Sequence, residues 1–454
     1  MRATEAAWLI VPGDKIGMIM PHRNTELCNA AMPFVHSERT SHACCPKNSL
    51  QRLDRTAPKP SRRIPDNTGN WFAVRPFRAP ILELGVSMKL FACPNCASRL
   101  YFENGQCLAC GSSVLYEPGQ AAFVLAGETA IACANAAECD CNWVADARGS
   151  FCRACALNKT IPNLSVPGNR ARWARVEAAK KRALYTLYAF GLPASPKAHP
   201  DDEAGLAFDF LADPLGGGPG GERILTGHDN GLITLNVAEA DSAQREKMRV
   251  EMGENYRTLL GHFRHELGHY YWDRLIRDDE ARMTEFLALF GDSTVDYETA
   301  LRAHYANGAP SDWQERHISA YAASHPWEDW AETWAHYLHI TDTLEMVQSL
   351  NMRLGQLDTV DPHALSNRDA GGGAVEGDGD RAEEHFSTIL ARWLVLSEAS
   401  NSINRCMGLP DLYPFVISPV VGGKLRFVHD LLGGHHAPPR HSDGVPATMS
   451  PAVT

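Results

Sequence analysis

Apolar side chains recur at helical spacing in several segments of this chain after residue 169. The segments with this pattern are residues 170–190, 243–276, 280–290, 296–306, 312–323, 327–356 and 381–405. The clearest strand is the short, apolar and β-branched segment 232–237. The pattern therefore predicts an α+β fold, mainly helical with a short sheet.

Changes in composition divide the chain into four parts. Residues 1–87 show no sustained helical or strand period and are rich in Pro, Arg, Ser and Asn. We expect them to be disordered or a mis-assigned extension before a natural start at Met88, with a genuine flexible arm as the alternative. The remaining parts are a cysteine-rich module at 88–160, a larger helical domain at 161–432 and a disordered tail at 433–454.

Charge is distributed unevenly along the chain. The net charge is −11, but residues 1–87 carry +5 and the remainder −16. Nucleic-acid binding depends on clustered Lys and Arg, so the acidic body argues against nucleic acid as the main partner. The cysteine module carries 5 Lys or Arg against 6 Asp or Glu, which favours a structural or protein-binding role for it.

The cysteines and the absence of export signals bear on localisation. Nine of the thirteen cysteines fall between Cys93 and Cys155. No stretch approaches the ~20 apolar residues that a membrane-spanning helix needs. The first twenty residues lack the combined features of a signal peptide. We therefore expect a cytoplasmic protein with no membrane association, whose cysteines bind zinc rather than form disulfides.

The cysteines form two sets with metal-binding spacing. The first set is Cys93-x-x-Cys96 and Cys107-x-x-Cys110, two pairs separated by ten residues, which predicts a zinc site of four thiolates. The second set is Cys133, Cys141, Cys152 and Cys155, with Cys139 competing with Cys141. Free buried cysteines are the alternative for the second set.

The segment His265-Glu266-Leu267-Gly268-His269 lies within the helical pattern at 243–276. Histidines four residues apart leave the same face of a helix, so both can bind one metal ion. Glu266 would reach a water on that metal and take its proton as the water attacks a carbonyl. Two surface histidines on an ordinary helix are the alternative. The apolar residues around them disfavour it, because buried histidines need partners.

A catalytic zinc ion usually has three protein ligands, so a third residue is expected elsewhere. Segment 325–336 combines acidic and aromatic residues, and Pro326 suits the first turn of a new helix. Glu328 would bind zinc, while Glu332 on the same face hydrogen-bonds the distal nitrogen of a histidine ligand. We expect Glu328 rather than Asp329 to be the ligand, because small alanines share its face. The alternative to a metal site is that these carboxylates are ordinary acidic residues at the start of a helix, paired with Lys or Arg elsewhere.

A residue that stabilises the charge developing on the attacked carbonyl should also exist. Tyr321, shortly before the predicted helix, is the first candidate and His325 is the second. An ordinary role in the core is the alternative for each of them.

Several longer motifs carry a resemblance to a known family. They are Cys133-Ala-Asn-Ala, Cys141-Asn-Trp, Cys152-Arg-Ala-Cys155-Ala-Leu-Asn, His265-Glu-Leu-Gly-His-Tyr-Tyr-Trp-Asp and His325-Pro-Trp-Glu-Asp-Trp-Ala-Glu-Thr-Trp-Ala-His-Tyr-Leu. With these motifs, residues 88–430 resemble the bacterial "putative zinc-binding metallopeptidase" family with an N-terminal zinc ribbon. The helix with His265 and the later Glu328 also resemble gluzincin-type peptidases.

The resemblance implies roles for individual residues. His265, His269 and Glu328 would be the ligands of a catalytic zinc ion, and Glu266 would be the base. Cys141 rather than Cys139 would belong to the second cysteine set, whose motif it matches.

The sequence thus predicts a zinc-dependent metallopeptidase that hydrolyses peptide bonds through a zinc-bound water activated by Glu266. We expect a zincin-like domain behind a β-rich double zinc ribbon, with one catalytic and two structural zinc ions. Segment 232–237 should lie beside the catalytic helix at the edge of the cleft, where a peptide or protein substrate could add as a strand. The ribbon could bind a protein partner. The alternatives are a zinc hydrolase of a non-peptide amide or ester, and an interaction module with a vestigial metal site.

Overall fold

The computed structural model describes residues 90–213, 224, 226–251, 258–352 and 378–433. The predicted extension at 1–87 lies outside the described residues, as does all of the predicted tail after Gly433. The described residues belong to one compact unit, Glu83–Thr454. Within the described ranges, no helix is both long and apolar enough to cross a membrane.

The cysteine module consists of short antiparallel hairpins. β1 (Phe91–Ala92) pairs with β2 (Arg99–Leu100), β3 (Val114–Glu117) with β4 (Ala122–Leu125), and β5 (Ile131–Ala132) with β6 (Val144–Ala145). The short helix α1 (Ala136–Cys139) and the 3-10 turn η1 (Cys155–Leu157) complete the module. Two-stranded hairpins are barely stable alone, so these need a shared core.

Aromatic rings supply that core and join the module to helix α2 (Asn169–Ala189). Phe102 packs edge-on against Tyr116 at 5.0 Å and against Tyr185 of α2 at 5.2 Å between ring centroids. Trp143 is fully buried and lies 5.2 Å from Tyr116. Aromatic pairs in such tilted and edge-on arrangements add to the free energy of burial. The cysteine module and α2 therefore share one hydrophobic core.

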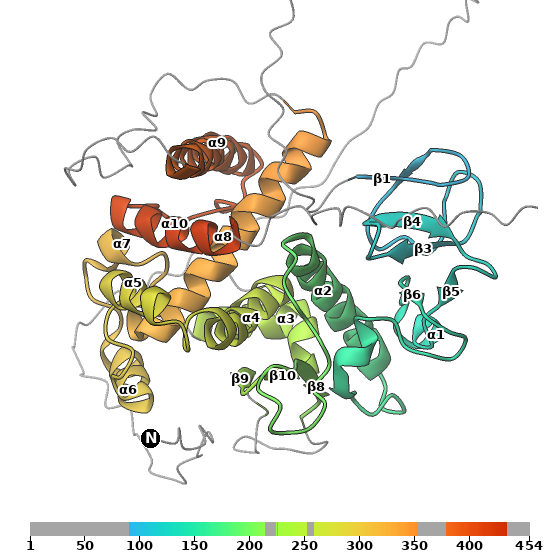
Figure 1. Cartoon of the computed structure of the whole chain (residues 1–454), viewed down its shortest axis with the longest axis horizontal. Coiled ribbons are helices and arrows are strands. Elements are labelled where there is room, and N and C mark those ends of the chain that lie inside the picture. The colour runs from blue at the N-terminus through green and yellow to red at the C-terminus, as the bar shows by residue number, and fades with distance from the viewer. Residues whose placement is uncertain (1–89, 214–223, 225, 252–257, 353–377, 434–454) are drawn as a thin grey trace, which may run out of the picture. The chain divides into compact units, whose positions relative to one another are not determined.

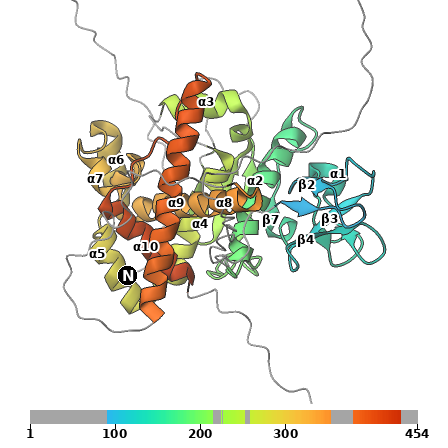
Figure 2. The ribbon, with the colours of Figure 1, turned by 90° about the horizontal axis from the view of Figure 1, so that it is seen from above.

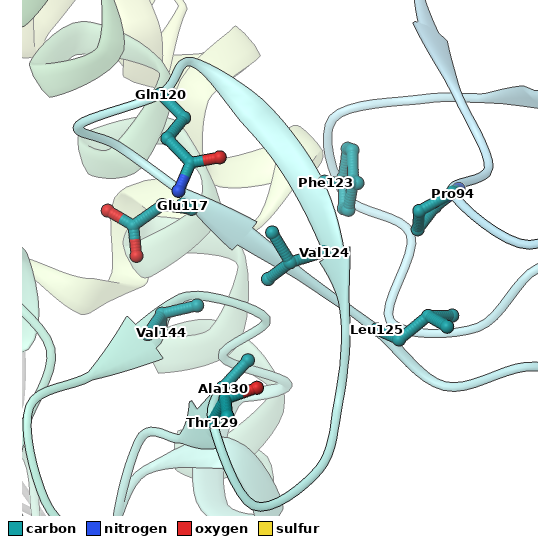
Figure 3. Close-up of a pocket in the computed structure, with 9 residues that line it drawn as sticks. All are labelled: Pro94, Glu117, Gln120, Phe123, Val124, Leu125, Thr129, Ala130 and Val144. Atoms are coloured by element: carbon teal, nitrogen blue, oxygen red, sulfur yellow. The ribbon is translucent and has the colours of Figure 1, made fainter.

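A hollow of about 460 Å³ opens beside the β3–β4 hairpin (Figure 3). Its lining residues are Pro94, Glu117, Gln120, Phe123, Val124, Leu125, Thr129, Ala130 and Val144. All of them belong to the cysteine module, so this hollow is separate from the predicted catalytic residues.

A four-stranded sheet precedes most of the helices. Its strand order is β7 (Asn158–Thr160), β8 (Ala207–Leu211), β10 (Leu232–Asn236) and β9 (Gly227–Asp229). β8 pairs in parallel with β7 and with β10, and β10 pairs antiparallel with β9. β7 belongs to the predicted cysteine module by sequence, but it lies in the sheet of the following domain.

The predicted strand at 232–237 is β10, but its position differs from the expectation. β10 lies inside the sheet between β8 and β9, and β9 is the outer strand that packs against α4 (Leu259–Leu275). The expectation that a peptide could add as a strand to segment 232–237 is therefore wrong, because β10 already has a neighbouring strand on each side. The edge strand β9 is only three residues long and carries no apolar alternation by which its sequence could identify it.

Helices make up most of the remaining structure. They are η2 (Val237–Ala240), α3 (Ser242–Glu251), α4, α5 (Glu280–Phe290), α6 (Tyr297–Asn307), α7 (Trp313–Arg316), η3 (Tyr321–Ser324), α8 (Pro326–Ser349), α9 (Asp378–Cys406) and α10 (Pro419–Gly433). The predicted fold class is confirmed, since a mainly helical domain with a small sheet follows a β-rich cysteine module.

Three helical segments differ from their predictions. Segment 243–276 is not one helix, because α3 ends at Glu251 and the extended Thr258 (φ −124°, ψ 156°) precedes α4. Segment 312–323 is not one helix, because the extended backbone of His317 (φ −129°, ψ 147°) ends α7, and the short turn η3 follows. α10 was not predicted. Its adjacent Gly422 and Gly423 weaken the helical signal, although apolar residues on both sides of them are buried.

α8 runs through the middle of the helical domain, where it packs against α4, α9 and α10 (Figures 1 and 2). Gly268 makes the contact between α4 and α8 close. A Cβ atom at Gly268 would lie 3.0 Å from the Cα of Ala331 and 3.2 Å from the ring of Trp334. The indole N–H of Trp330 also donates to the carbonyl of Gly268 at 2.8 Å. Glycine at this position therefore lets the two helices approach.

Candidate metal centre

Helix α4 presents His265 and His269 on one face. The helix begins after Thr258, whose side chain accepts a hydrogen bond from the amide of Gly261 at 2.9 Å. The Nε2 atoms of the two histidines lie 3.2 Å apart. Both side chains are buried, as is Glu266 between them. The predicted pair therefore converges in the interior rather than at the surface.

The first turn of α8 brings Glu328 to the same point. His325 caps this helix by accepting the amide hydrogen of Trp327 at 3.0 Å, and Pro326 occupies its first turn. Glu328 Oε2 lies 3.0 Å from Nε2 of His265 and 3.5 Å from Nε2 of His269. Two helices that are about sixty residues apart in sequence thus supply three converging ligand atoms.

These three atoms fit a zinc ion. Zinc–ligand bonds of about 2.0–2.1 Å in a tetrahedron place two ligand atoms about 3.3 Å apart, and the observed separations are 3.0, 3.2 and 3.5 Å. Glu328 is 1% exposed, and its Oε2 lies within 3.5 Å of both imidazole nitrogens. A buried carboxylate oxygen facing two imidazole nitrogens needs a cation. This donor set of two histidines and one glutamate suits zinc.

Electrostatics around His265 also favour a cation. Burial opposes a charge on its ring, but hydrogen bonds and charges from Glu328 and Glu332 raise the pKa of His265 well above its usual range. The pKa of Glu328 is held well below its usual range despite burial, mainly by His269 and His265. These opposite shifts are those of an ion pair between His265 and Glu328, in which a metal ion could replace the proton.

Glu332, one turn after Glu328, contacts the other side of His265. Its Oε1 lies 2.8 Å from Nδ1 of His265, and its Oε2 accepts a hydrogen bond from Ser319 Oγ at 2.7 Å. Burial raises the pKa of Glu332, but the hydrogen bond and charge of His265, with smaller effects of His336 and Ser319, together lower it to about 2. The hydrogen bond that the spacing predicted for Glu332 is present.

Asp329 faces away from this cluster. Its carboxylate lies 2.5 Å from Nζ of Lys424 on α10 and 3.0 Å from Nδ1 of His317. Lys424 also donates to the carbonyl of Arg316 at 2.7 Å. Asp329 and Lys424 are both buried, so this ion pair ties α8 to α10 and to the end of α7.

Tyr297, the first residue of α6, was not among the predicted site residues. Its hydroxyl donates to Oε1 of Glu328 at 2.5 Å, which holds the carboxylate in place. Burial, followed by the charge of Glu328, raises the pKa of Tyr297 far above its usual range. No spacing links Tyr297 to the two motifs, so no signal in the sequence could have found it.

The two candidates for stabilising the attacked carbonyl differ in their surroundings. The ring of Tyr321 lies 5.9 Å from the ring of His265. Both nitrogens of His325 are engaged, Nδ1 by the amide of Trp327 and Nε2 by the carbonyl of Val295 at 3.1 Å. Tyr321 therefore lies nearer the ligand cluster, and His325 is a helix cap.

Two further rings border His269. Trp327 packs on it with ring centroids 3.8 Å apart, and His228 of β9 lies 6.3 Å away in a nearly parallel orientation. Burial, with help from the charges of His269 and Lys197, lowers the pKa of His228 to about 3. His228 was not singled out from the sequence, since it lies in an inconspicuous polar segment.

The first cysteine set converges as its spacing predicts. The Sγ atoms of Cys93 and Cys110 lie 3.7 Å apart, as do those of Cys96 and Cys107. A disulfide would need about 2.05 Å, whereas zinc–sulfur bonds of about 2.3 Å in a tetrahedron place the sulfur atoms about 3.8 Å apart. The four thiols therefore fit a zinc ion.

The second set includes Cys133, Cys141, Cys152 and Cys155, all of them buried. Cys141 Sγ lies 3.6 Å from Cys152 Sγ and 3.7 Å from Cys155 Sγ. Cys139 is not in this group but lies with Cys155 and Glu177 of α2. This arrangement favours Cys141 over Cys139.

Helix α2 places buried charges beside this second set. Lys180 and Lys181 are both buried. Both pair with Glu177, at 2.8 and 3.3 Å. Burial opposes the charge of Lys181, but Glu177 and the nearby cysteines raise its pKa well above the usual range. Two ammonium groups can thus offset the charge of a four-thiolate zinc site.

Two family models and several relatives match this chain. The family model described as "Putative zinc-binding metallo-peptidase" matches residues 169–431, and a zinc-ribbon domain model matches residues 90–166. Similar relatives are an uncharacterized protein of Mycobacterium tuberculosis and one of Mycobacterium bovis. Each is 41% identical over 349 residues, which cover 76% of this chain and 95% of the relative. No solved structure matches the chain.

Proposed function

The chain belongs to the family described as "Putative zinc-binding metallo-peptidase", and we propose that it is a gluzincin-type peptidase that hydrolyses peptide bonds. Its ligands for the catalytic zinc ion are His265, His269 and Glu328. The single observation that carries this proposal is the triangle of their ligand atoms, with sides of 3.0, 3.2 and 3.5 Å. A buried Glu266 beside this triangle distinguishes a hydrolytic centre from a purely structural zinc site.

In the proposed reaction, zinc when bound lowers the pKa of a coordinated water to about 7 and polarises the substrate carbonyl. Glu266 accepts the proton of the attacking water and delivers it to the leaving amine. Glu332 holds His265 through Nδ1, and Tyr297 holds Glu328 through Oε1. Tyr321 remains the candidate that donates a hydrogen bond to the carbonyl oxygen as negative charge develops there.

The position of β9 supports an extended peptide as substrate. β9 is the outer strand of the sheet and packs against α4, the helix that carries the two histidines. A peptide could pair with the backbone of this strand and place its scissile bond beside the metal. This geometry favours a peptide over a small amide or ester, which could not use a strand edge.

The two cysteine sets are proposed to hold one structural zinc ion each, giving three zinc ions per chain. Their sulfur separations of 3.6–3.7 Å support this count. The second set also contacts α2 through Glu177, whose Oε2 lies 3.8 Å from Cys155 Sγ. The ribbon could in addition bind a protein partner.

The test is to measure hydrolysis of unfolded casein by the zinc-loaded full chain and by its Glu266→Gln variant. We expect the wild type to cleave, a chelator to abolish cleavage and added zinc to restore it. Glu266→Gln should keep its zinc and its melting temperature, because the substitution removes none of the zinc ligands. Its rate of hydrolysis should fall at least ~100-fold, because the substitution removes the base. Glu285→Gln, an exposed change on α5, is the control. Full activity in Glu266→Gln would overturn the mechanism.

A further inference from the structure

The central residue of β9, His228, faces helix α4. Its ring centroid lies 6.3 Å from that of His269, 6.4 Å from Tyr270 and 6.2 Å from Trp327. The side chain therefore lies between the outer strand of the sheet and the metal ligands. A peptide paired with β9 would pass beside it.

A backbone hydrogen bond determines the tautomer of His228. Its Nε2 accepts the amide hydrogen of Gly231 at 2.9 Å. A ring nitrogen that accepts carries no proton, so the neutral imidazole has its proton on Nδ1 and donates from there.

The turn that supplies this amide is itself rigid. Asn230 and Gly231 have φ values of 44° and 75°, as in the tight hairpin turns that Asn-Gly favours. A Cβ atom at Gly231 would lie 2.2 Å from the carbonyl oxygen of Gly205, so only glycine fits there. The orientation of the His228 ring is thus fixed by the backbone of its own hairpin.

The Nδ1 atom of His228 is buried and has no acceptor among the described residues. The indole nitrogen Nε1 of Trp327, whose ring packs on His269, is buried without an acceptor too. Unpaired buried donors destabilise a folded protein, so most are satisfied by protein, water or a ligand. Here two such donors, from β9 and from α8, flank one metal ligand.

We propose that His228, through its Nδ1–H, binds a backbone carbonyl oxygen of the peptide substrate on the His269 side of the metal. This inference rests on the proposed function and adds a substrate-binding residue to it. A neutral carbonyl suits this donor, because a neutral imidazole offers a single N–H and no charge with which to pair a carboxylate or phosphate. A peptide lying along β9 presents carbonyl groups at regular intervals at this position.

Two substitutions separate this role from a structural one. In His228→Gln, the side-chain oxygen can still accept from Gly231 at the Nε2 position, but no donor remains at the Nδ1 position. In His228→Asn, the amide nitrogen replaces Nδ1–H, whereas the bond to Gly231 is lost. The control is His199→Gln, because His199 is exposed in a neighbouring loop.

The experiment uses the zinc-loaded full chain and the casein-derived peptide that the wild type cleaves fastest. We expect His228→Gln to raise KM about tenfold, as for loss of one hydrogen bond, and to leave kcat largely unchanged. His228→Asn should keep KM near the wild-type value while lowering the melting temperature. Inhibition by acetohydroxamate, which reaches the metal without a peptide backbone, should be equal in all variants. Calorimetry measures the affinity of the same peptide for the Glu266→Gln variant, with and without the His228→Gln substitution. This comparison tests peptide binding in the absence of turnover.

The outcomes distinguish this inference from the function on which it rests. A wild type that cleaves peptides, with an unchanged KM in His228→Gln, would overturn the role of His228 alone. Loss of affinity in His228→Asn with none in His228→Gln would show that the residue acts only through its hydrogen bond to the hairpin. A wild type that binds zinc but cleaves no peptide would overturn the proposed function, and this inference with it.

Discussion

The Nδ1 atom of His265 lies 2.8 Å from Oε1 of Glu332, and this contact leaves Nε2 as the ring nitrogen directed toward His269 and Glu328. A carboxylate only accepts, so Nδ1 carries the proton and Nε2 presents its lone pair toward His269 and Glu328. Ser319 fixes the other oxygen of Glu332 at 2.7 Å. The orientation of one proposed ligand therefore depends on a residue that does not touch the metal.

We expect Glu332→Gln to weaken zinc binding at the catalytic site by about 10–100-fold, because glutamine keeps an acceptor but loses the charge. The two ribbon sites should keep their zinc. Competition with a chelator of known affinity measures the loss, and Glu285→Gln on the exposed face of α5 is the control. Unchanged affinity would show that the contact with His265 is incidental.

Glu328→Ala and Asp329→Ala should have opposite effects. Glu328→Ala should lower the zinc content from three ions per chain to two, because it removes a ligand and leaves the cysteines intact. Asp329→Ala should keep three ions but lower the free energy of unfolding by about 3–5 kcal/mol, since Lys424 would remain buried without its partner. Elemental analysis and urea unfolding measure the two effects. Loss of one zinc ion in Asp329→Ala, with three retained in Glu328→Ala, would reverse the assignment.

His336 should make stability depend on pH. Burial, opposed in part by Glu332, lowers its pKa to about 4, whereas an unfolded histidine titrates near 6.5. Because the folded-state pKa is the lower one, this contribution to stability is present above about pH 6.5 and is lost as the pH falls toward 4.

The substitution His336→Asn removes this titration and can keep the hydrogen bond that Nδ1 makes to the hydroxyl of Tyr413 at 2.8 Å. The loss of unfolding free energy between pH 7.5 and pH 5 should become smaller by about 2 kcal/mol. Urea unfolding of wild type and variant at both values measures it. The prediction fails if both proteins lose the same free energy.

Deleting residues 1–87 should leave the melting temperature and zinc content unchanged, because their sequence has no apolar period with which to join a core. These residues lie outside the described part of the chain, so this prediction comes from sequence alone. Differential scanning fluorimetry and elemental analysis of the shortened chain test it. A fall of more than a few degrees would show that the segment stabilises the folded domain.

The sequence by itself determined the relationships that lie within one element. The 3.6-residue period of a helix places His265 and His269 on one face, whatever surrounds them. The same holds for Glu328 and Glu332 one turn apart, and C-x-x-C spacing likewise brings two thiols to one metal. Apolar periodicity was enough to predict most helices and the mainly helical class.

Only the tertiary structure decided which elements meet. Gly268 identifies a close approach, but the folded chain shows that α8 makes it. Tyr297 contacts Glu328, Lys424 pairs with Asp329, and β9 rather than β10 forms the edge of the sheet. These contacts join residues that are distant along the chain. They depend on how buried side chains fill the space between elements, which no local period encodes.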